Sequence, residues 1–297
     1  MWKKIILIAV LVLAAGAAAF LSFGKPLNDS GFPSKGKALR LVTYNVGAFH
    51  KSGSDMTSEI AAMMQELGAD VLSLNELDSC NARHPSFQLA EFCSRMGEWR
   101  YRFSKAIDYQ GGAYGIGVVF QPILDSLQTL TLSLPKADGA EQRVASVAVF
   151  PSFVFISTHL DHTSSNARKL QIRSITAFVS DHFASSDKPV FLCGDFNAKP
   201  SSEEIQGMAD DWTLLSPQAA ASGPVSNSVA NSVADSAADS AVGTFPADAP
   251  DRIIDYIFAF NNGATYRVTG GGICTHFASA DVTLTSDHLP VYVDVIF

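Results

Sequence analysis

Short apolar runs that end in polar residues recur along the chain, and each is typical of a buried strand that reaches the surface. The clearest runs span 38–44, 70–74, 116–120, 153–157, 190–193, 253–258 and 291–296, with further strands predicted near 99–103, 127–134 and 143–150. Apolar residues spaced by three or four predict helices around 60–67, 87–96 and 167–183. With 297 residues, the chain is long enough for one large α/β domain or two small ones.

The most informative run, FLCGDFN (191–197), ends at Gly194 and is followed by Asp195 and Asn197. If the strand continues past Gly194, these two side chains point the same way, because residues two apart share a face. A carboxylate can accept a proton or bind a metal, and a carboxamide can donate hydrogen bonds to a charged oxygen. The same residues are also typical of a capped turn, so this segment alone leaves both interpretations open.

Other polar residues follow or interrupt the predicted strands. Asn45 comes directly after one strand, and Asn75 and Glu76 follow the next. Glu76 is either a surface carboxylate or a hard oxygen ligand for Mg²⁺. A lone histidine after a strand is usually structural, but His159 ends a third strand of this kind. Asp255 lies inside an apolar run and needs a partner. His288 is its natural partner, since a carboxylate that orients an imidazole is a common catalytic arrangement.

The N-terminus carries a membrane signal in residues 1–24. Lys3 and Lys4 precede an uninterrupted apolar stretch, 5–23, which is about the length needed to cross a bilayer. We expect a membrane anchor with the following domain outside the cytoplasm. The alternative is a signal peptide cleaved near the small residues 15–17, followed by secretion. Residues 25–37, which include glycine, proline, serine and lysine, are interpreted as a linker.

Residues 227–242 read NSVA NSVA DSAA DSAV, and we interpret about 216–242 as a disordered insertion. The net charge of −8 argues against tight binding to long polyanions, although a bound metal can supply positive charge locally. None of the four cysteines has metal-site spacing, and Cys80 and Cys93 are candidates to pair in an oxidising compartment.

Six motifs together resemble the endonuclease/exonuclease/phosphatase superfamily: TYNV (43–46), LNEL (74–77), THLD (158–161), GDFN (194–197), IDYIF (254–258) and SDHLP (286–290). Each motif is weak alone, but all six occur in the family's order between residues 39 and 297. The resemblance implies a four-layer α/β/β/α sandwich, with two mixed sheets packed together and helices outside, as a catalytic domain over 38–297. It also implies Mg²⁺- or Mn²⁺-dependent cleavage of a phosphoester.

The resemblance also assigns roles. It implies a metal site made by Asn45, Glu76 and Asp287. The catalytic group would be Asp195 and Asn197 beside the attacking water and phosphate, His159 and His288 on the phosphoryl oxygens, and Asp255 polarising His288. The general base is either His288 or Asp195. Tyr114 and Arg143 resemble phosphate contacts of the nuclease branch.

Two positions depart from the family pattern. Asn75 stands where family members often carry glutamine before the metal-binding glutamate. The stretch YGIG (114–117) replaces the family's glycine–asparagine motif, and we interpret the surrounding glycines (111–115) as a turn before the next strand.

The substrate is the least determined feature. Three classes remain: nucleic acid, a lipid headgroup and a small phosphorylated metabolite. Basic residues between Glu76 and His159 place a non-specific nuclease slightly ahead of the other two: Arg83, His84, Arg100, Arg102, Lys105 and Arg143. We expect a monomer. A binding module without catalysis is a further alternative, but every motif carboxylate, carboxamide and histidine is present.

Overall fold

A computed structural model describes residues 31–51, 53–217 and 243–297. Lys35–Phe297 form one compact unit, so the end of the predicted linker belongs to the domain. The predicted membrane segment and most of the predicted insertion lie outside the described residues. Within the part of the chain that is described, no helix is both long and apolar enough to span a membrane.

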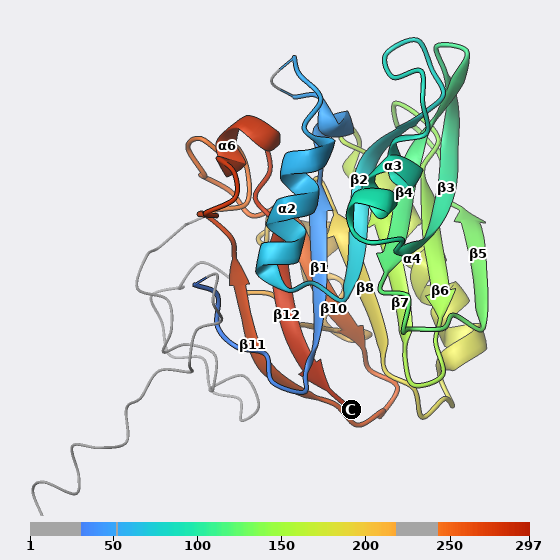
Figure 1. Ribbon diagram of the computed structural model, residues 1–297. Coiled ribbons are helices and arrows are strands. Elements are labelled where there is room, and N and C mark those ends of the chain that lie inside the picture. The colour runs from blue at the N-terminus through green and yellow to red at the C-terminus, as the bar shows by residue number, and fades with distance from the viewer. Residues whose placement is uncertain (1–30, 52, 218–242) are drawn as a thin grey trace, which may run out of the picture. The chain divides into compact units, whose positions relative to one another are not determined.

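Two six-stranded mixed sheets form the centre of the domain (Figure 1). In order, the first sheet contains β11 (Arg267–Ile273), β12 (Val291–Ile296), β1 (Leu39–Asn45), β2 (Val71–Ser79), β4 (Gly112–Phe120) and β3 (Arg100–Tyr109). The second contains β5 (Gln128–Ser133), β6 (Val144–Val149), β7 (Val154–His159), β8 (Val190–Asp195), β10 (Asp255–Phe260) and β9 (Trp212–Leu214). β1 pairs parallel with β2, and β7 pairs parallel with β8.

Helices connect these parallel pairs and cover the outer faces of the sheets. α2 (Thr57–Leu67) joins β1 to β2, and α4 (Ser165–Phe183) joins β7 to β8. α3 (Gln88–Arg95) lies beside α2 on the first sheet, as Figure 1 shows. Short helices follow at η1 (Gly47–Phe49), α5 (Glu203–Gln206) and α6 (Val282–Thr285). The expected four-layer α/β/β/α sandwich is confirmed.

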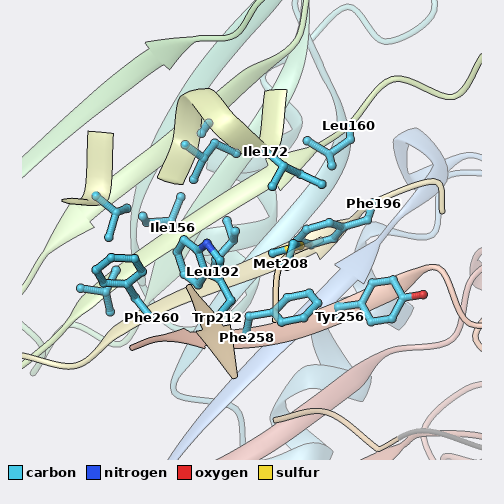
Figure 2. Close-up of a cluster of buried hydrophobic side chains, with 14 of the residues drawn as sticks. Ile156, Leu160, Ile172, Leu192, Phe196, Met208, Trp212, Tyr256, Phe258 and Phe260 are labelled. Carbon is cyan, nitrogen blue, oxygen red and sulfur yellow. The ribbon is translucent and has the colours of Figure 1, made fainter. Parts of the chain in front are cut away.

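Separate apolar clusters fill the space between the layers. One lies between the sheets and includes Leu41, Phe155 and Val293. A second lies beneath α4, where Ile172 packs with Leu192 of β8 and other side chains shown in Figure 2. Burial of such clusters is the main favourable contribution to folding. It fixes both sheets and therefore the strand ends that carry the polar motifs.

Several expectations need correction. The glycines at 112 and 115 are part of β4, so the turn before that strand is at Gln110–Gly111 rather than across 111–115. β9 and β11 have no counterpart among the predicted strands. Ser216 is buried and accepts a hydrogen bond from the Ile257 amide at 3.2 Å, so the insertion does not begin there. All four cysteines are free thiols, with Cys80 exposed and Cys93 buried.

Candidate active site

Asp195 stands in the middle of a row of three polar residues on adjacent strands. The sheet register places it opposite His159 of β7 on one side and opposite Asp255 of β10 on the other. Gly194 makes this possible, because its φ is +156° and a Cβ there would lie 1.9 Å from the Thr158 carbonyl oxygen. The sequence therefore needs a glycine directly before the carboxylate.

Three groups surround the Asp195 carboxylate. Its Oδ2 accepts a hydrogen bond from Asn45 Nδ2 at 3.1 Å. The same oxygen lies 3.4 Å from His159 Nε2 and 3.7 Å from His288 Nε2. Burial raises the pKa of Asp195 to about 7, against the lowering effect of His288. A carboxyl with such a pKa can exchange a proton near neutral pH.

Asn197 reaches the site through a turn. Its φ is +50°, so the strand pleat, which was the condition for a shared face, does not persist. Its backbone amide instead donates to Asp195 Oδ1 at 2.8 Å, which is the capped turn that was the other interpretation. The turn still brings the side chains together, because Asn197 Nδ2 lies 3.0 Å from His159 Nε2.

Glu76 enters the site from a bulge within β2. The strand continues to Ser79, and its register against β4 shifts between Leu74 and Leu77, so Glu76 does not follow a strand end as predicted. Its φ is +60°, an uncommon conformation for a residue with a side chain. Glu76 Oε1 accepts a hydrogen bond from Asn45 Nδ2 at 3.1 Å. A bulge re-aims a side chain in this way.

His288 is oriented by Asp255. Its Nδ1 lies 2.9 Å from Asp255 Oδ2, which confirms the predicted pairing. Although burial alone lowers it, Asp255 and Asp195 raise the pKa of His288 to about 10. The ring of Phe245 packs against the imidazole with centroids 4.8 Å apart. His159 behaves oppositely, because burial followed by the charge of Arg143 holds its pKa well below the ordinary value. At neutral pH the site therefore contains one cationic and one neutral imidazole.

A pocket of about 280 Å³ opens over these groups. Eight of the ten predicted site residues line it: Glu76, Tyr114, Arg143, His159, Asp195, Asn197, Asp287 and His288. Asn45 and Asp255 are buried and contact the lining residues from behind. The pocket also has three lining residues that sequence reasoning missed: Glu141, His162 and Phe245.

Two of the missed residues hold Arg143. Its Nη2 lies 3.1 Å from Glu141 Oε1 and 3.1 Å from His162 Nδ1. Arg143 is buried, and its Nε has no hydrogen-bond partner among the described residues. Glu141 and Arg143 both lie in the loop before β6, where no strand periodicity relates their side chains, so no sequence signal predicted the contact. His162 likewise carried no signal beyond its place in the polar stretch after His159.

Asn75 connects the two sheets at the site. It is fully buried, its Oδ1 accepts from the Asp195 amide at 3.1 Å, and its Nδ2 donates to the Thr158 carbonyl at 2.9 Å. The side chain therefore fixes the ends of β7 and β8 from the opposite sheet. This contact gives a structural role to the position that departs from the family's glutamine.

The donor set fits a hard divalent cation. Glu76, Asp195 and Asp287 bring three carboxylates to one pocket, and carboxylate oxygens are the ligands that Mg²⁺ prefers. Asp287 also forms an ion pair with Lys51. Asn45 turns its amide nitrogen, not its oxygen, towards Glu76, and its Oδ1 accepts from the Gly47 amide.

A different acidic cluster is more tightly packed. Ligand atoms of Asp195, Asp255 and His288 lie within 4.8 Å of one another. Within this cluster, His288 Nδ1 and Asp255 Oδ2 already bond to each other. The half-buried Glu76 and Asp287 are the more accessible candidates for a metal.

Solved structures share this fold. A mannosyl-6-phosphatase of Bacteroides thetaiotaomicron VPI-5482 is 18% identical with a TM-score of 0.66, over 87% of this chain and 100% of that one. An endonuclease/exonuclease/phosphatase from Bacteroides vulgatus is 16% identical with a TM-score of 0.67, over 88% and 100%. The human Nocturnin catalytic domain is 17% identical with a TM-score of 0.63, over 88% and 93%.

No curated protein matches the chain in sequence. The profile of the Endonuclease/Exonuclease/phosphatase family, by contrast, matches residues 42–288, which include five of the six motifs in full and the first three residues of the sixth. The order of the motifs, the two packed sheets and this match agree. The chain therefore belongs to the endonuclease/exonuclease/phosphatase family.

Proposed function

We propose that this protein hydrolyses phosphoesters with the help of Mg²⁺ or Mn²⁺, by in-line attack of an activated water. The observation that carries the proposal is the row His159–Asp195–Asp255, with His288 and Glu76 facing the same pocket. Phosphoryl transfer depends mainly on positioning and on stabilising negative charge. Together these residues supply a proton acceptor in Asp195, an oriented cation in His288 and a neutral imidazole in His159.

Asp195 is the general base in this proposal. Its pKa of about 7 allows it to take a proton from water at neutral pH, whereas His288, with a pKa of about 10, is already protonated. The choice left open by the sequence is thereby made in favour of Asp195. His288 then binds a phosphoryl oxygen as a cation, and Asp255 keeps its Nε2 aimed at the pocket.

The remaining residues bind and orient the phosphoryl group. Asn197 donates from its amide nitrogen, and Arg143 offers its unpartnered Nε to a phosphate oxygen. Glu76 and Asp287 would hold the divalent cation, with Asn45 holding the Glu76 carboxylate. When bound, the cation neutralises charge that develops on the phosphoryl oxygens.

We place a small phosphorylated molecule ahead of nucleic acid as the substrate. Among the basic residues that favoured a nuclease, Arg83 pairs with Asp78, Arg100 with Asp125 and Lys105 with Asp108. Of that group, only Arg143 lines the pocket. A nucleic-acid backbone needs several accessible cations. A nuclease is the second candidate, because Tyr114 and Arg143, which resemble phosphate contacts of nucleases, both line the pocket.

The test incubates the purified protein with Mg²⁺, Mn²⁺ or EDTA and three substrate groups: small phosphomonoesters and diesters, plasmid DNA, and phospholipid vesicles. We expect turnover of small esters that stops in EDTA and returns with either metal. Glu76→Gln should need far more metal, and Glu203→Gln, at an exposed carboxylate, is the control. Full activity in EDTA would reject the metal assignment, and DNA as the only substrate turned over would restore the nuclease.

A further inference from the structure

The end of the domain opposite the active site carries an apolar groove of about 390 Å³. Leu39, Leu124, Phe153, Ile296 and Phe297 are among the residues that line it. β1 runs from Leu39 at the groove to Asn45 at the active site, which separates the two by about 20 Å at roughly 3.3 Å per residue. β12 likewise starts just after His288 and ends at the groove. The C-terminus marks this end in Figure 1.

Large apolar side chains are exposed at the groove and in the loop beside it. Ile123 and Phe297 line the groove and are 84% and 44% exposed, and Leu127, four positions after Ile123, is 65% exposed. They are three of the five large apolar residues that are exposed in the described part of the chain. Ile123 and Leu127 belong to the loop between β4 and β5. This loop follows Phe120, the last residue of β4, which pairs with Val71 at the start of β2. Clustered apolar exposure of this kind marks an interaction surface.

The charges at this end suit a lipid surface. Lys35 and Lys37 line the groove; Lys35 pairs with Asp70, which also lines it, whereas Lys37 is exposed. Asp125 lies in the same loop, between Ile123 and Leu127, and its exposed carboxylate pairs with Arg100. Apolar side chains framed by lysines are the combination that binds the interface of a membrane with anionic lipids.

The chain also enters the domain here. The apolar stretch 5–23 is followed by only eleven residues, 24–34, before Lys35 at the groove. Eleven extended residues span at most about 40 Å. We propose that this end of the domain, with Ile123, Leu127 and Phe297, rests on the surface of a bilayer. The proposal rests on the predicted membrane anchor and is independent of the catalytic activity.

Membrane docking at this end constrains the substrate. The active-site pocket then faces away from the bilayer, because β1 and β12 connect the two ends. Substrates therefore reach the pocket from the aqueous phase rather than from the membrane on which the protein rests. This orientation favours a water-soluble phosphoester over a lipid headgroup in that same membrane.

The test uses full-length protein in nanodiscs of phosphatidylcholine and phosphatidylglycerol with brominated acyl chains, which quench nearby tryptophan. Ile123→Trp places a reporter on the proposed surface. Leu284→Trp is the matched control, since Leu284 is also exposed, at 56%, but lies in α6 close to the active-site motif 286–290. After subtraction of the parent emission, we expect the Ile123→Trp signal to shift to the blue and lose most of its intensity, while Leu284→Trp is unchanged.

A second variant tests the surface itself. Leu127→Trp should be quenched in the same way, and adding Ile123→Asp should restore its emission, because a charge at the centre of the patch opposes insertion. An unquenched Ile123→Trp would overturn the proposal. So would recovery of the protein in the soluble fraction without its N-terminal segment. A dimer in the nanodisc that buries Ile123 without lipid quenching would assign the surface to a second copy of the chain instead.

Discussion

His288 and Asp255 form a hydrogen-bonded pair, with Nδ1 2.9 Å from Oδ2, although 33 positions separate them in the chain. Asp255 begins β10, and His288 precedes β12 of the other sheet. The pair therefore connects the two sheets at the pocket. Asp255 raises the pKa of His288, so the imidazole stays cationic. Its Nε2 lies 3.7 Å from Oδ2 of Asp195.

The first prediction concerns the pH profile. Activity should rise as Asp195 ionises through a pKa of about 7 and fall as His288 loses its proton near 10. Asp255 raises the pKa of both groups, so Asp255→Asn should move both limbs to lower pH. We also expect kcat to fall roughly 100-fold, a size typical of lost acid–base positioning.

The measurement combines kcat against pH with NMR titration of the His288 ring. Asp187→Asn, which changes a carboxylate in the turn before β8, is the control and should leave both limbs in place. An alkaline limb that does not move in Asp255→Asn would show that Asp255 does not charge His288.

The second prediction concerns strain at Glu76. A residue with a side chain at φ +60° costs about 1 kcal/mol, which glycine avoids. Glu76→Gly should therefore raise the melting temperature by roughly 2–4 °C while abolishing activity. Glu91→Gly, inside α3, should lower the melting temperature and leave activity intact. A destabilised Glu76→Gly would mean that the side chain, and not the backbone, holds the bulge.

The third prediction concerns Asn75. Asn75→Ala leaves the Asp195 amide and the Thr158 carbonyl without their buried partner, at about 1–3 kcal/mol for each group. We expect lower stability in urea and a lower kcat, because both strand ends lose their position. Ser73→Ala is the matched control, since Ser73 also bridges the sheets, to Ser157 at 2.7 Å, without contacting Asp195. It should lose stability alone, and an equal loss of kcat in both variants would contradict a positioning role for Asn75.

The fourth prediction concerns the residues that hold Arg143. Glu141→Gln and His162→Ala each remove one partner of Nη2 and should raise KM roughly tenfold, the size of one charged hydrogen bond, with a smaller effect on kcat. The double variant should show coupling, because both residues contact the same nitrogen. Additive effects on KM, or an effect on kcat alone, would separate these residues from substrate binding.

The fifth prediction concerns stability away from the pocket. Arg40 and Asp294 form a buried two-bond ion pair, at 2.7 and 2.8 Å, with each side chain 1% exposed. Asp294→Ala should destabilise the fold by about 3–5 kcal/mol, because it removes the carboxylate that balances the charge of a buried guanidinium. Asp125→Ala, in the exposed pair with Arg100, should cost about 0–1 kcal/mol. Similar losses from both variants in urea unfolding would show that burial does not govern the energetics of the first pair.

The sequence by itself determined most elements of the fold. The predicted strand 291–296 coincides with β12, and the helix predicted around 60–67 ends at Leu67, followed by Gly68 at φ +70°. Such features depend on local periodicity and on residues with special backbone preferences, which a single segment contains. The order of the six motifs likewise identified the family and eight residues that line the pocket.

Only the tertiary structure decided how these residues meet. Asp255 faces Asp195 because β10 and β8 pair in one register, and a slip of one residue would turn the side chain to the other face. The Glu76 bulge, the Asn75 bridge and the Glu141–Arg143–His162 contacts depend on strands far apart in the chain. No local pattern specifies such contacts, because they arise when the apolar faces of two sheets pack and fix every strand end at once.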